Sequence, residues 1–419
     1  MPAVDGRHSA LVPVAEARPA LDAPPPRVQT AGLAPRPHDT AGRRPAGEMT
    51  NPQDFEIFLA AAPGLEALLA EEVRGKGFRQ PKAVPGGVVL KGGWPEVWRA
   101  NLWLRGAGRV LARLDAFHVT HLAQLDGRAR RVPWASVLRP DVPFRVEVAC
   151  HKSRIYHSDA AAQRIETAIR ETLHAPQSET ADVLVRARID HDLCTISIDT
   201  SGEALHKRGY KQAVNAAPLR ETMASLFLQA CGYTGQETLL DPMCGSGTFV
   251  IEAAEIAARL NPGRNRPFAF EQLASFDAEA WQRMRQVQSS RPPAARCHGY
   301  DRDAGAVEMS RANAARAGVS DSTEFHQAPI SALAPPAGPP GLVMVNPPYG
   351  TRLGERDKLV PLYQALGQVL ASRFAGWRVG LVAAEPALAR ATRLPFLPPG
   401  APVPHGGLRV TLYRTGVLA

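Results

Sequence analysis

The sequence has few cysteines and no long apolar run, and each of these deficits argues against a class of protein. Its five cysteines include no C-x-x-C pair, which argues against a zinc site or a disulfide framework and for a reducing, cytoplasmic environment. No apolar stretch approaches the roughly 18 residues that a membrane-spanning helix needs. We therefore expect a cytoplasmic protein that binds no metal and has no membrane partner.

Positive charge exceeds negative charge in this chain. The sequence has 49 Lys and Arg against 40 Asp and Glu, a formal net charge of +9 and a pI near 9.6. This excess weakly favours a polyanionic partner such as a nucleic acid. With 419 residues the chain is also too long for one ordinary hydrophobic core, so about two or three domains are expected.

The first fifty residues are rich in Pro, Ala and Arg and show no hydrophobic periodicity. Such a segment buries too little apolar surface to become ordered, so residues 1–50 are predicted to be a disordered extension. The segment has six Arg and five acids and is nearly neutral, which argues against an RNA-binding arm. An alternative is that translation starts at Met49, because a folded pattern begins at Phe55. Both interpretations stay open.

Short strands and helices follow one another without regular alternation between residues 55 and 200, which is typical of an α+β fold. Hydrophobic periodicity predicts a turn and strand at 85–90, strands at 55–59, 144–148, 183–189 and 194–199, and helices at 64–74, 95–112 and 158–173. The last two strands are predicted to pair as an antiparallel hairpin around Asp190-His-Asp192.

From about Gly209 the pattern changes to a regular alternation of strands and helices. Strands are predicted at 236–240, 295–300, 342–345, 377–384 and 408–415, and helices at 248–260, 304–317 and 360–374. This alternation predicts a doubly wound α/β sheet.

A glycine-rich turn, Asp241-Pro-Met-Cys-Gly-Ser-Gly-Thr248, joins a predicted strand to a predicted helix. Gly245 and Gly247 let the backbone approach a ligand closely, and a helix N-terminus favours a carboxylate. The turn lacks the Gly-Lys-Ser/Thr ending of a phosphate loop and has Val250 in place of the third glycine of a dinucleotide fold. S-adenosylmethionine, which carries a carboxylate and no phosphate, therefore fits better than ATP or NAD. The alternative is an ordinary strand-to-helix turn.

A second polar turn, Tyr300-Asp-Arg-Asp303, ends the next predicted strand. An acid at this place in a doubly wound sheet accepts hydrogen bonds from the two ribose hydroxyls of a nucleoside ligand. Asp301 is the better candidate because it lies nearest the strand end. Asp303 alternatively caps the helix that follows.

The tetrapeptide Asn346-Pro-Pro-Tyr349 follows the apolar run Leu342–Val345, which is typical of a buried parallel strand. It is therefore expected on the loop at the carboxyl end of that strand, where open α/β sheets bind their ligands. Two prolines fix the backbone and remove two N–H donors, so the loop offers carbonyl acceptors. These acceptors, the amide oxygen of Asn346 and the ring of Tyr349 suit a planar base with an exocyclic NH2 group. The loop thus indicates methylation of a nucleobase amine.

With these motifs in order, the chain resembles the THUMP-domain RNA (guanine-N2)-methyltransferases. The likeness covers about residues 55–419 and includes the strings Lys152–His157, Ser201–Tyr210 and Ala217–Thr222. Within the family it is greatest to the N-terminal methylase half of enzymes that act on bacterial 23S rRNA. The resemblance implies a ferredoxin-like segment at 55–96 and a THUMP RNA-binding domain at 97–200. It also implies a class I (Rossmann-like) S-adenosylmethionine-dependent methyltransferase domain at 210–419.

The resemblance also implies roles for the residues of the three motifs. The cofactor is expected to contact the glycine turn, through Asp241, Pro242, Gly245, Gly247 and Thr248, and its ribose is expected to be held by Asp301. The guanine is expected to be held by Asn346, Pro347 and Tyr349. One departure concerns the adenine amine, because Pro329 stands where the family usually has an acid after the third strand of this domain. Gln327 or a backbone group is expected to make that contact instead.

Guanine N2 is a poor nucleophile, because its lone pair is delocalised into the ring. If the Asn346 side chain and the Pro347 carbonyl accept both amine hydrogens, they localise that lone pair and stabilise the positive charge of the transition state. No strong base is needed, since the product ammonium is acidic enough to lose its proton to water. Cys244 is accordingly expected to be a packing residue and not a nucleophile.

Two basic clusters carry interleaved aromatic residues, as in readers of single-stranded or looped RNA. We predict RNA contacts in the first from Lys152, Arg154, Tyr156 and His157, and in the second from Lys207 and Arg208. The alternative for each cluster is an ordinary solvated face.

The favoured function is transfer of a methyl group from S-adenosylmethionine to the N2 amine of a guanine in 23S rRNA. Guanine-N2 methylation of tRNA stays open, because the motifs do not separate the two substrates. A non-catalytic RNA-binding or ribosome-assembly factor stays open as well, with Pro329 as its support.

Overall fold

We describe a computed structural model of the chain for residues 54–211, 219–287, 290–349 and 355–419. The predicted extension at 1–50, the alternative start at Met49 and part of the string Ala217–Thr222 lie outside these residues. Among the described residues, no helix is both long enough and apolar enough to cross a membrane.

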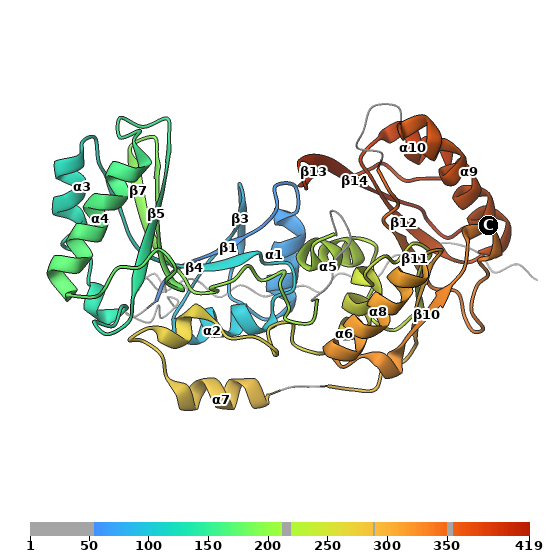
Figure 1. Ribbon diagram of the computed structural model, residues 1–419, viewed down its shortest axis with the longest axis horizontal. Helices are drawn as coiled ribbons and strands as arrows, with labels where there is room; N and C mark the ends of the chain where they lie inside the picture. Colours follow the sequence, from blue (N-terminus) through green and yellow to red (C-terminus); the bar gives the residue numbers. More distant parts are fainter. Residues whose placement is uncertain (1–53, 212–218, 288–289, 350–354) are drawn as a thin grey trace, which may run out of the picture. The chain divides into compact units, whose positions relative to one another are not determined.

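The first part of the described chain forms a seven-stranded sheet in the order β2-β3-β1-β4-β7-β6-β5 (Figure 1). Neighbouring strands are antiparallel except β5 and β6, which are parallel. The strands are β1 (Phe55–Ala60), β2 (Lys82–Val84), β3 (Gly87–Gly92), β4 (Arg109–His118), β5 (Phe144–His151), β6 (Val183–Asp190) and β7 (Leu193–Asp199). The helices are α1 (Glu66–Gly75), α2 (Trp94–Trp103), α3 (Leu122–Ala129) and α4 (Ser158–Leu173).

Most elements predicted in this region are confirmed, including the β6–β7 hairpin, but the helix predicted at 95–112 is wrong in its second half. Helix α2 ends at Trp103, and β4 begins at Arg109. Gly106 and Gly108 lie between the two elements, and glycine weakens a helix. Beyond them Val110 and Ala112 are buried at alternate positions, the period of a strand, and β4 pairs with both β1 and β7.

The second part of the chain forms another seven-stranded sheet, in the order β10-β9-β8-β11-β12-β14-β13. Strands β10 to β12 are parallel, and β14 and β13 are added antiparallel. The strands are β8 (Leu239–Asp241), β9 (Cys297–Asp301), β10 (Thr323–Gln327), β11 (Leu342–Val345), β12 (Arg378–Ala383), β13 (Val403–His405) and β14 (Leu408–Arg414). The helices are α5 (Glu221–Ala230), α6 (Thr248–Ala257), α7 (Ala278–Gln286), α8 (Ala304–Ala317), α9 (Glu355–Arg373) and α10 (Pro386–Ala391).

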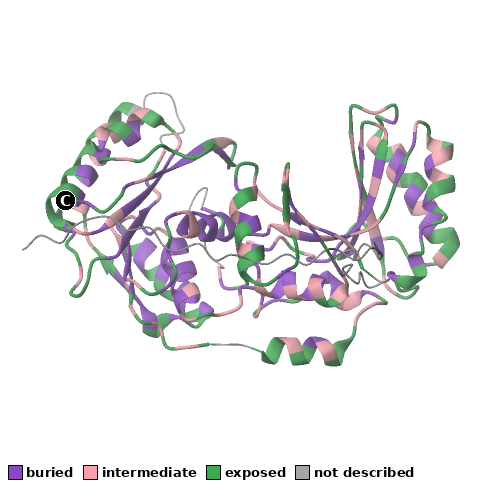
Figure 2. Cartoon of the chain, turned by 180° about the vertical axis from the view of Figure 1, so that it is seen from behind, coloured by how far each residue is buried: buried purple, intermediate pink, exposed green. Residues whose placement is uncertain are grey.

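Side chains of β11 show why this sheet is covered on both faces. Leu342 and Met344 pack into a core that contains residues of α5, α6 and α8. Val343 and Val345 point to the other face and pack against α9 and α10. Strand β11 is correspondingly buried along its whole length, and β12 is buried from Val379 to Ala383 (Figure 2). The predicted doubly wound α/β class is therefore confirmed, although β10 and β13 were not predicted.

Candidate active site

The three sequence motifs meet at the carboxyl ends of β8, β9 and β11. Strand β8 lies between β9 and β11, so the order of the sheet reverses at this point, where doubly wound sheets bind ligands. Leu240 of β8 pairs in register with Val343 of β11. The glycine turn after β8 and the Asn346–Tyr349 loop after β11 therefore leave the sheet from adjacent strands.

The glycine turn has a backbone that requires its two glycines. Gly245 and Gly247 have positive φ angles of 54° and 83°, and Gly247 directly precedes α6. A Cβ added to Gly247 would lie 3.1 Å from Oγ of Ser310. Ser310 also donates a hydrogen bond to the Gly245 carbonyl at 2.8 Å, and Nδ2 of Asn313 donates to the Ser246 carbonyl at 3.0 Å.

Ser310 and Asn313 were not identified from the sequence. Both are fully buried on α8, three residues apart. The sequence did offer one signal, since both polar residues lie on the apolar face of a predicted helix. A buried polar side chain needs a hydrogen-bond partner, which would have indicated a contact with another segment.

Asp301 joins the acid turn to the glycine turn. Its Oδ2 accepts a hydrogen bond from the Gly245 N–H at 3.0 Å, and its Oδ1 accepts one from the Asp303 N–H at 3.0 Å. The side chain is half-buried, and each of its oxygens has a further lone pair for a ligand. Asp303 instead caps α8 by accepting a hydrogen bond from Gly305 N–H at 3.0 Å, as the alternative interpretation held.

The end of β10 lies beside this acid turn. Gln327 is opposite Asp301 in the parallel register and is exposed, and its Nε2 donates to the Arg302 carbonyl at 3.2 Å. Pro329 lies two residues further along and is also exposed. Gln327 thus lies beside the acid turn, and its contact with adenine stays a prediction.

Asp241 is a buried carboxyl beside a second acid. It accepts a hydrogen bond from Met243 N–H at 3.0 Å and makes no ion pair with any cation in the described part of the chain. Burial raises the pKa of the Asp241 carboxyl to about 8, and the nearby Asp301 carboxylate adds to the rise. A ligand with positive charge would therefore be favoured here. Pro242 is buried next to Asp241 in the same turn.

Lys211 adds a cation at the start of α6. Its Nζ lies 3.0 Å from Oε1 of Glu221 and 2.8 Å from Oγ1 of Thr248, the first residue of α6. Burial raises the pKa of the Glu221 carboxyl, against the effect of Lys211. A cation next to a helix N-terminus suits a carboxylate group. Sequence reasoning missed Lys211, which no motif marks.

The Asn346–Tyr349 loop is held by two tyrosine hydroxyls. Tyr349 donates a short hydrogen bond to Oδ1 of Asn346, and Tyr363 of α9 donates to the Pro348 carbonyl at 3.1 Å. Burial raises the pKa of both phenols, so both are donors at neutral pH. The Asn346 oxygen keeps one lone pair, and the Pro347 carbonyl accepts no hydrogen bond from the described residues. Both oxygens that the prediction assigned to the amine thus have acceptor capacity that no described residue uses.

Cys244 is buried within the glycine turn. Its Sγ lies 3.8 Å from Oγ of Ser310, and burial raises the pKa of the thiol well above its usual value. This environment is that of a small packing residue and not of a thiolate nucleophile.

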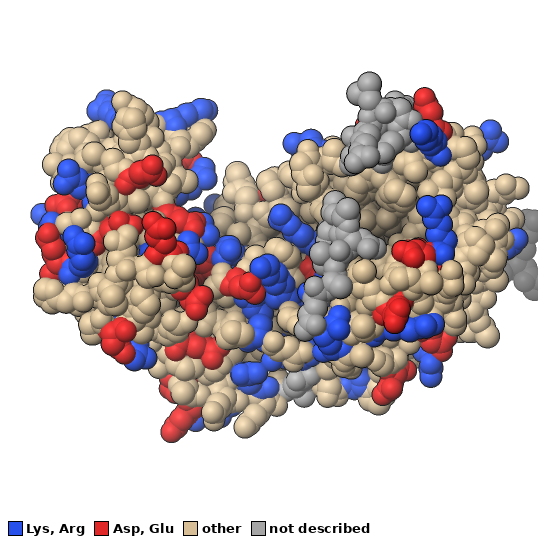
Figure 3. Space-filling view, viewed as in Figure 1, with Lys and Arg blue, Asp and Glu red and all other residues tan. Residues whose placement is uncertain are grey.

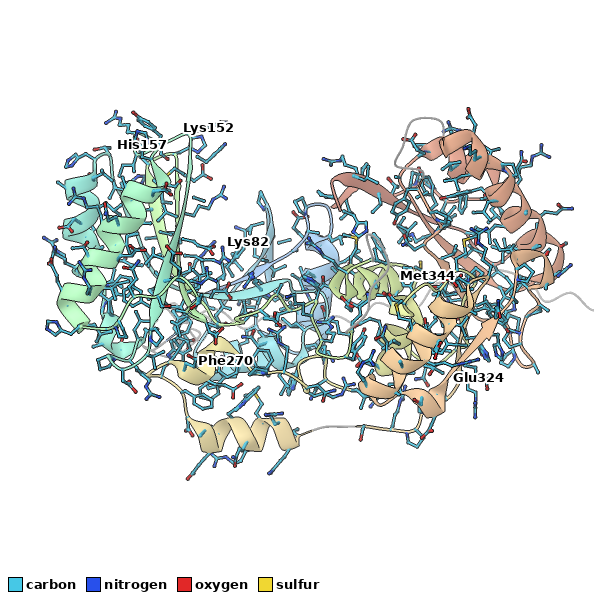
Figure 4. All side chains as sticks on the ribbon, in the orientation of Figure 1. Lys82, Lys152, His157, Phe270, Glu324 and Met344 are labelled. Atoms are coloured by element: carbon cyan, nitrogen blue, oxygen red, sulfur yellow. The ribbon has the colours of Figure 1, made fainter. Side chains whose placement is uncertain are left out.

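The first basic cluster lies at the carboxyl end of β5 and the start of α4, where Figure 4 labels Lys152 and His157. All four predicted side chains are exposed, and Tyr156 is 70% exposed. The Tyr156 and His157 rings lie 4.1 Å apart, and Nε of Arg154 is 3.8 Å from Asp192. An exposed ring among cations can stack on an RNA base.

Arg208 of the second cluster lies in a different environment from the one predicted. It is 3% exposed, and its guanidinium donates to Glu252 at 3.1 Å and to the Leu205 and Arg105 carbonyls at 2.7 Å. With its donors directed inward, it is unavailable to RNA, and we remove it from the predicted set. Lys207 is exposed and pairs with Glu203 at 2.8 Å.

Two groups of possible metal ligands occur among the described residues, although no metal was predicted. They are His151, Asp190 and His191 at the β5–β6 end of the first sheet, and His298, Glu324 and His326 on β9 and β10. Neither group contains a residue of the glycine turn or of the Asn346–Tyr349 loop.

Three family matches cover most of the described chain. Residues 56–111 match the RlmL ferredoxin-like domain, residues 119–199 match the THUMP domain, and residues 208–395 match the RMKL-like methyltransferase domain.

Similar proteins agree with these matches. The chain is 36% identical over 356 residues to the ribosomal RNA large subunit methyltransferase K/L of Syntrophotalea carbinolica, a match that covers 80% of this chain and 50% of that protein. The chain thus spans about half the length of this relative. A possible methylase from Clostridium difficile 630 superposes with a TM-score of 0.79 at 27% identity, covering 87% of this chain and 99% of its own. SMU.472, solved in complex with SAH, gives a TM-score of 0.78 at 26% identity, covering 88% and 99% of the two chains.

Proposed function

We propose that this chain methylates the N2 amine of a guanine in 23S rRNA with S-adenosylmethionine, because its residues match the RMKL-like methyltransferase domain behind the RlmL ferredoxin-like and THUMP domains. The observation that carries the proposal is the placement of the Asn346–Tyr349 loop and the glycine turn on adjacent strands. The relative with which the chain shares 36% identity is named as a large-subunit rRNA methyltransferase. The proposed domain limits are 55–96, 97–200 and 210–419.

The residues around the glycine turn fit S-adenosylmethionine. Asp241 is buried without a cationic partner among the described residues, so the positive charge of this cofactor would favour the ionised form of its carboxyl. Asp301 has lone pairs for ribose hydroxyls, and Lys211 lies where a carboxylate would meet the start of α6. A similar protein was solved with SAH, which supports the same choice.

The cofactor, when bound, supplies a methyl group on a positively charged sulfur. The chain's own residues act on the amine that receives it. The two N–H groups of the amine donate hydrogen bonds to the free lone pair of Asn346 Oδ1 and to the Pro347 carbonyl. These hydrogen bonds localise the nitrogen lone pair and stabilise the positive charge that develops on the nitrogen. Tyr349 fixes the orientation of the Asn346 amide by its hydrogen bond. Holding the two reactants in line gives the remaining acceleration.

Proton removal needs no base from the chain. The methylated nitrogen is acidic and releases its proton to water. The Tyr349 phenol and the Cys244 thiol both have pKa values that desolvation raises, so both stay protonated at neutral pH. They therefore act as a hydrogen-bond donor and a packing group.

We further propose that the exposed cluster of Lys152, Arg154, Tyr156 and His157 contacts the RNA, together with Lys207. A cytoplasmic location is part of the proposal, in keeping with five free cysteines. Two alternatives would replace this proposal: methylation of a guanine in a tRNA acceptor stem, and RNA binding without catalysis.

The substitution Asn346→Ala tests the chemistry. It removes one acceptor, so kcat for methyl transfer should fall by about 10²- to 10³-fold while RNA binding and SAH binding stay unchanged. Asn346→Asp keeps a carbonyl-type oxygen at the same place and should retain more activity than Asn346→Ala. Unchanged methyl transfer in Asn346→Ala would contradict the assigned chemistry.

A further inference from the structure

Two adjoining cavities lie next to the candidate active site. They have volumes of about 510 and about 480 Å³, and both are lined by His206 and Arg220. The first cavity also reaches Lys211 and His405, and the second reaches Arg109 on β4. We call the two together the His206–Arg220 hollow.

The hollow is in contact with both halves of the active site. Lys211 lines the first cavity and is hydrogen-bonded to Thr248 at the end of the glycine turn. His405 lines the same cavity, and its ring lies 6.3 Å from the Tyr349 ring in an edge-to-face arrangement. A strand whose base enters the site would therefore have its backbone near this hollow.

The first cavity has an excess of positive charge. It is lined by two acids, Glu203 and Glu221, and by four cations, Lys207, Arg208, Lys211 and Arg220, so its formal net charge is +2 when both histidines are counted as neutral. Three of the cations are paired, with Glu203, Glu252 and Glu221. Arg220 is exposed and has no ion pair with the described residues.

The positive charge of the cavity affects the pKa of His206. Burial lowers the pKa of its imidazole to about 4, and Arg220 is the largest of the neighbouring charges that add to the effect. Arg208, Lys207 and Lys211 act in the same direction. The imidazole is thus neutral at pH 7 and can donate one N–H to an anion.

The N-terminus of α5 adds to the positive charge of the hollow. Arg220 is its N-cap residue, no side chain caps the helix, and Thr222 of its first turn lines the second cavity. The N-terminus of a ten-residue helix carries partial positive charge, which adds to that of Arg220.

We propose that the His206–Arg220 hollow binds the phosphodiester groups that flank the target guanine, with Arg220 as their main cation and His206 as a neutral donor. This inference rests on the proposed function and specifies how the RNA strand enters the site. Drawing a guanine out of a helix loses its stacking energy, and contacts to the phosphates that flank it offset that cost where it arises. On the face that Figure 3 shows, Lys and Arg are interspersed with Asp and Glu.

A matched pair of substitutions tests the proposal. Arg220→Gln removes the unpaired cation of the hollow, and Arg79→Gln removes an exposed cation between α1 and β2. Both change the net charge by the same amount. Binding of an unmodified large-subunit rRNA transcript would be titrated at several salt concentrations, with SAH binding and thermal unfolding measured on the same preparations.

For Arg220→Gln we expect roughly 10-fold weaker RNA binding and a salt slope, d log K/d log[salt], smaller in magnitude by about 0.7, the value for one phosphate contact on a single strand. Arg79→Gln and Arg220→Lys should keep the native slope, and SAH binding should stay unchanged in all three. A native slope in Arg220→Gln would overturn the proposal. So would a loss of SAH binding, which would assign Arg220 to the cofactor. If the native protein methylates no RNA, the proposed function fails, and the salt slope still decides whether the hollow binds phosphate.

Discussion

The carboxylate of Asp301 accepts a hydrogen bond from the backbone N–H of Gly245 at 3.0 Å, across 56 positions of the sequence. This bond joins the turn after β9 to the turn after β8. The same glycine turn is held from behind by Ser310 and Asn313 of α8. These contacts of the fold hold the candidate cofactor site in place, and such preorganisation reduces the entropy lost on binding.

Asp301→Asn should weaken SAH binding by roughly 10- to 100-fold, because a hydrogen bond to a charged acceptor is worth about 1.5–3 kcal/mol. The neighbouring substitution Asp303→Asn is the control, since Asp303 caps α8 and does not contact the glycine turn. Isothermal titration with SAH distinguishes them. Equal losses in both variants would show that the acid turn acts only through the stability of α8.

Tyr349→Phe removes the hydroxyl that orients Asn346 and keeps the ring. We expect kcat to fall by roughly 2- to 10-fold, the value of one neutral hydrogen bond, with KM for RNA nearly unchanged. Tyr349→Ala should raise KM as well, because the ring is lost. Steady-state kinetics with both variants provide the comparison, and a native kcat in Tyr349→Phe would remove the orienting role.

Arg208→Met should destabilise the protein by about 3–5 kcal/mol, because it leaves buried Glu252 with Arg105 as its remaining cation. Burial alone would raise the pKa of the Glu252 carboxyl, but these two arginines hold that pKa below its usual range. The adjacent Lys207→Met, at an exposed site, should change stability by less than about 0.5 kcal/mol. Chemical denaturation measures both, and similar small effects would contradict a structural role for Arg208.

Asp241 predicts a pH dependence of stability. Its pKa of about 8 in the folded chain lies above the value of about 3.9 for an unfolded chain, so the folded state binds its proton more tightly. The free energy of unfolding should therefore fall as pH rises from about 4 to about 8, by up to about 1.4 kcal/mol per unit, and then level off. Asp301 and Cys244 are the titratable groups that face it. Asp241→Asn should remove this fall, and parallel pH profiles of the two proteins would contradict the assignment.

Much of the methyltransferase sheet could be predicted from the sequence, because parallel strands buried on both faces leave continuous apolar runs such as Leu342–Val345. The strand β13, with three residues, has no such signal. The prediction of a helix was wrong for the second half of residues 95–112, which begins β4. The glycines and the two-residue period of this segment argue against a helix, but they became decisive only once the partner strands were known.

The motifs located the candidate site, but the residues that support it could not be identified from the sequence. Local strings mark Asp241, Asp301 and Asn346, but Lys211 reaches Thr248 only through the tertiary fold. Arg208 illustrates the opposite error. It was interpreted with its exposed neighbour Lys207, whereas the two acids Glu252 and Glu255, three residues apart in an apolar helix, already indicated a need for buried cations.

The central claim is tested most directly by incubating the protein with labelled S-adenosylmethionine and either unmodified large-subunit rRNA or bulk tRNA, followed by nucleoside analysis. We expect N2-methylguanosine in the rRNA and no label in the tRNA. Label in tRNA alone, or SAH binding without transfer to either RNA, would contradict the account.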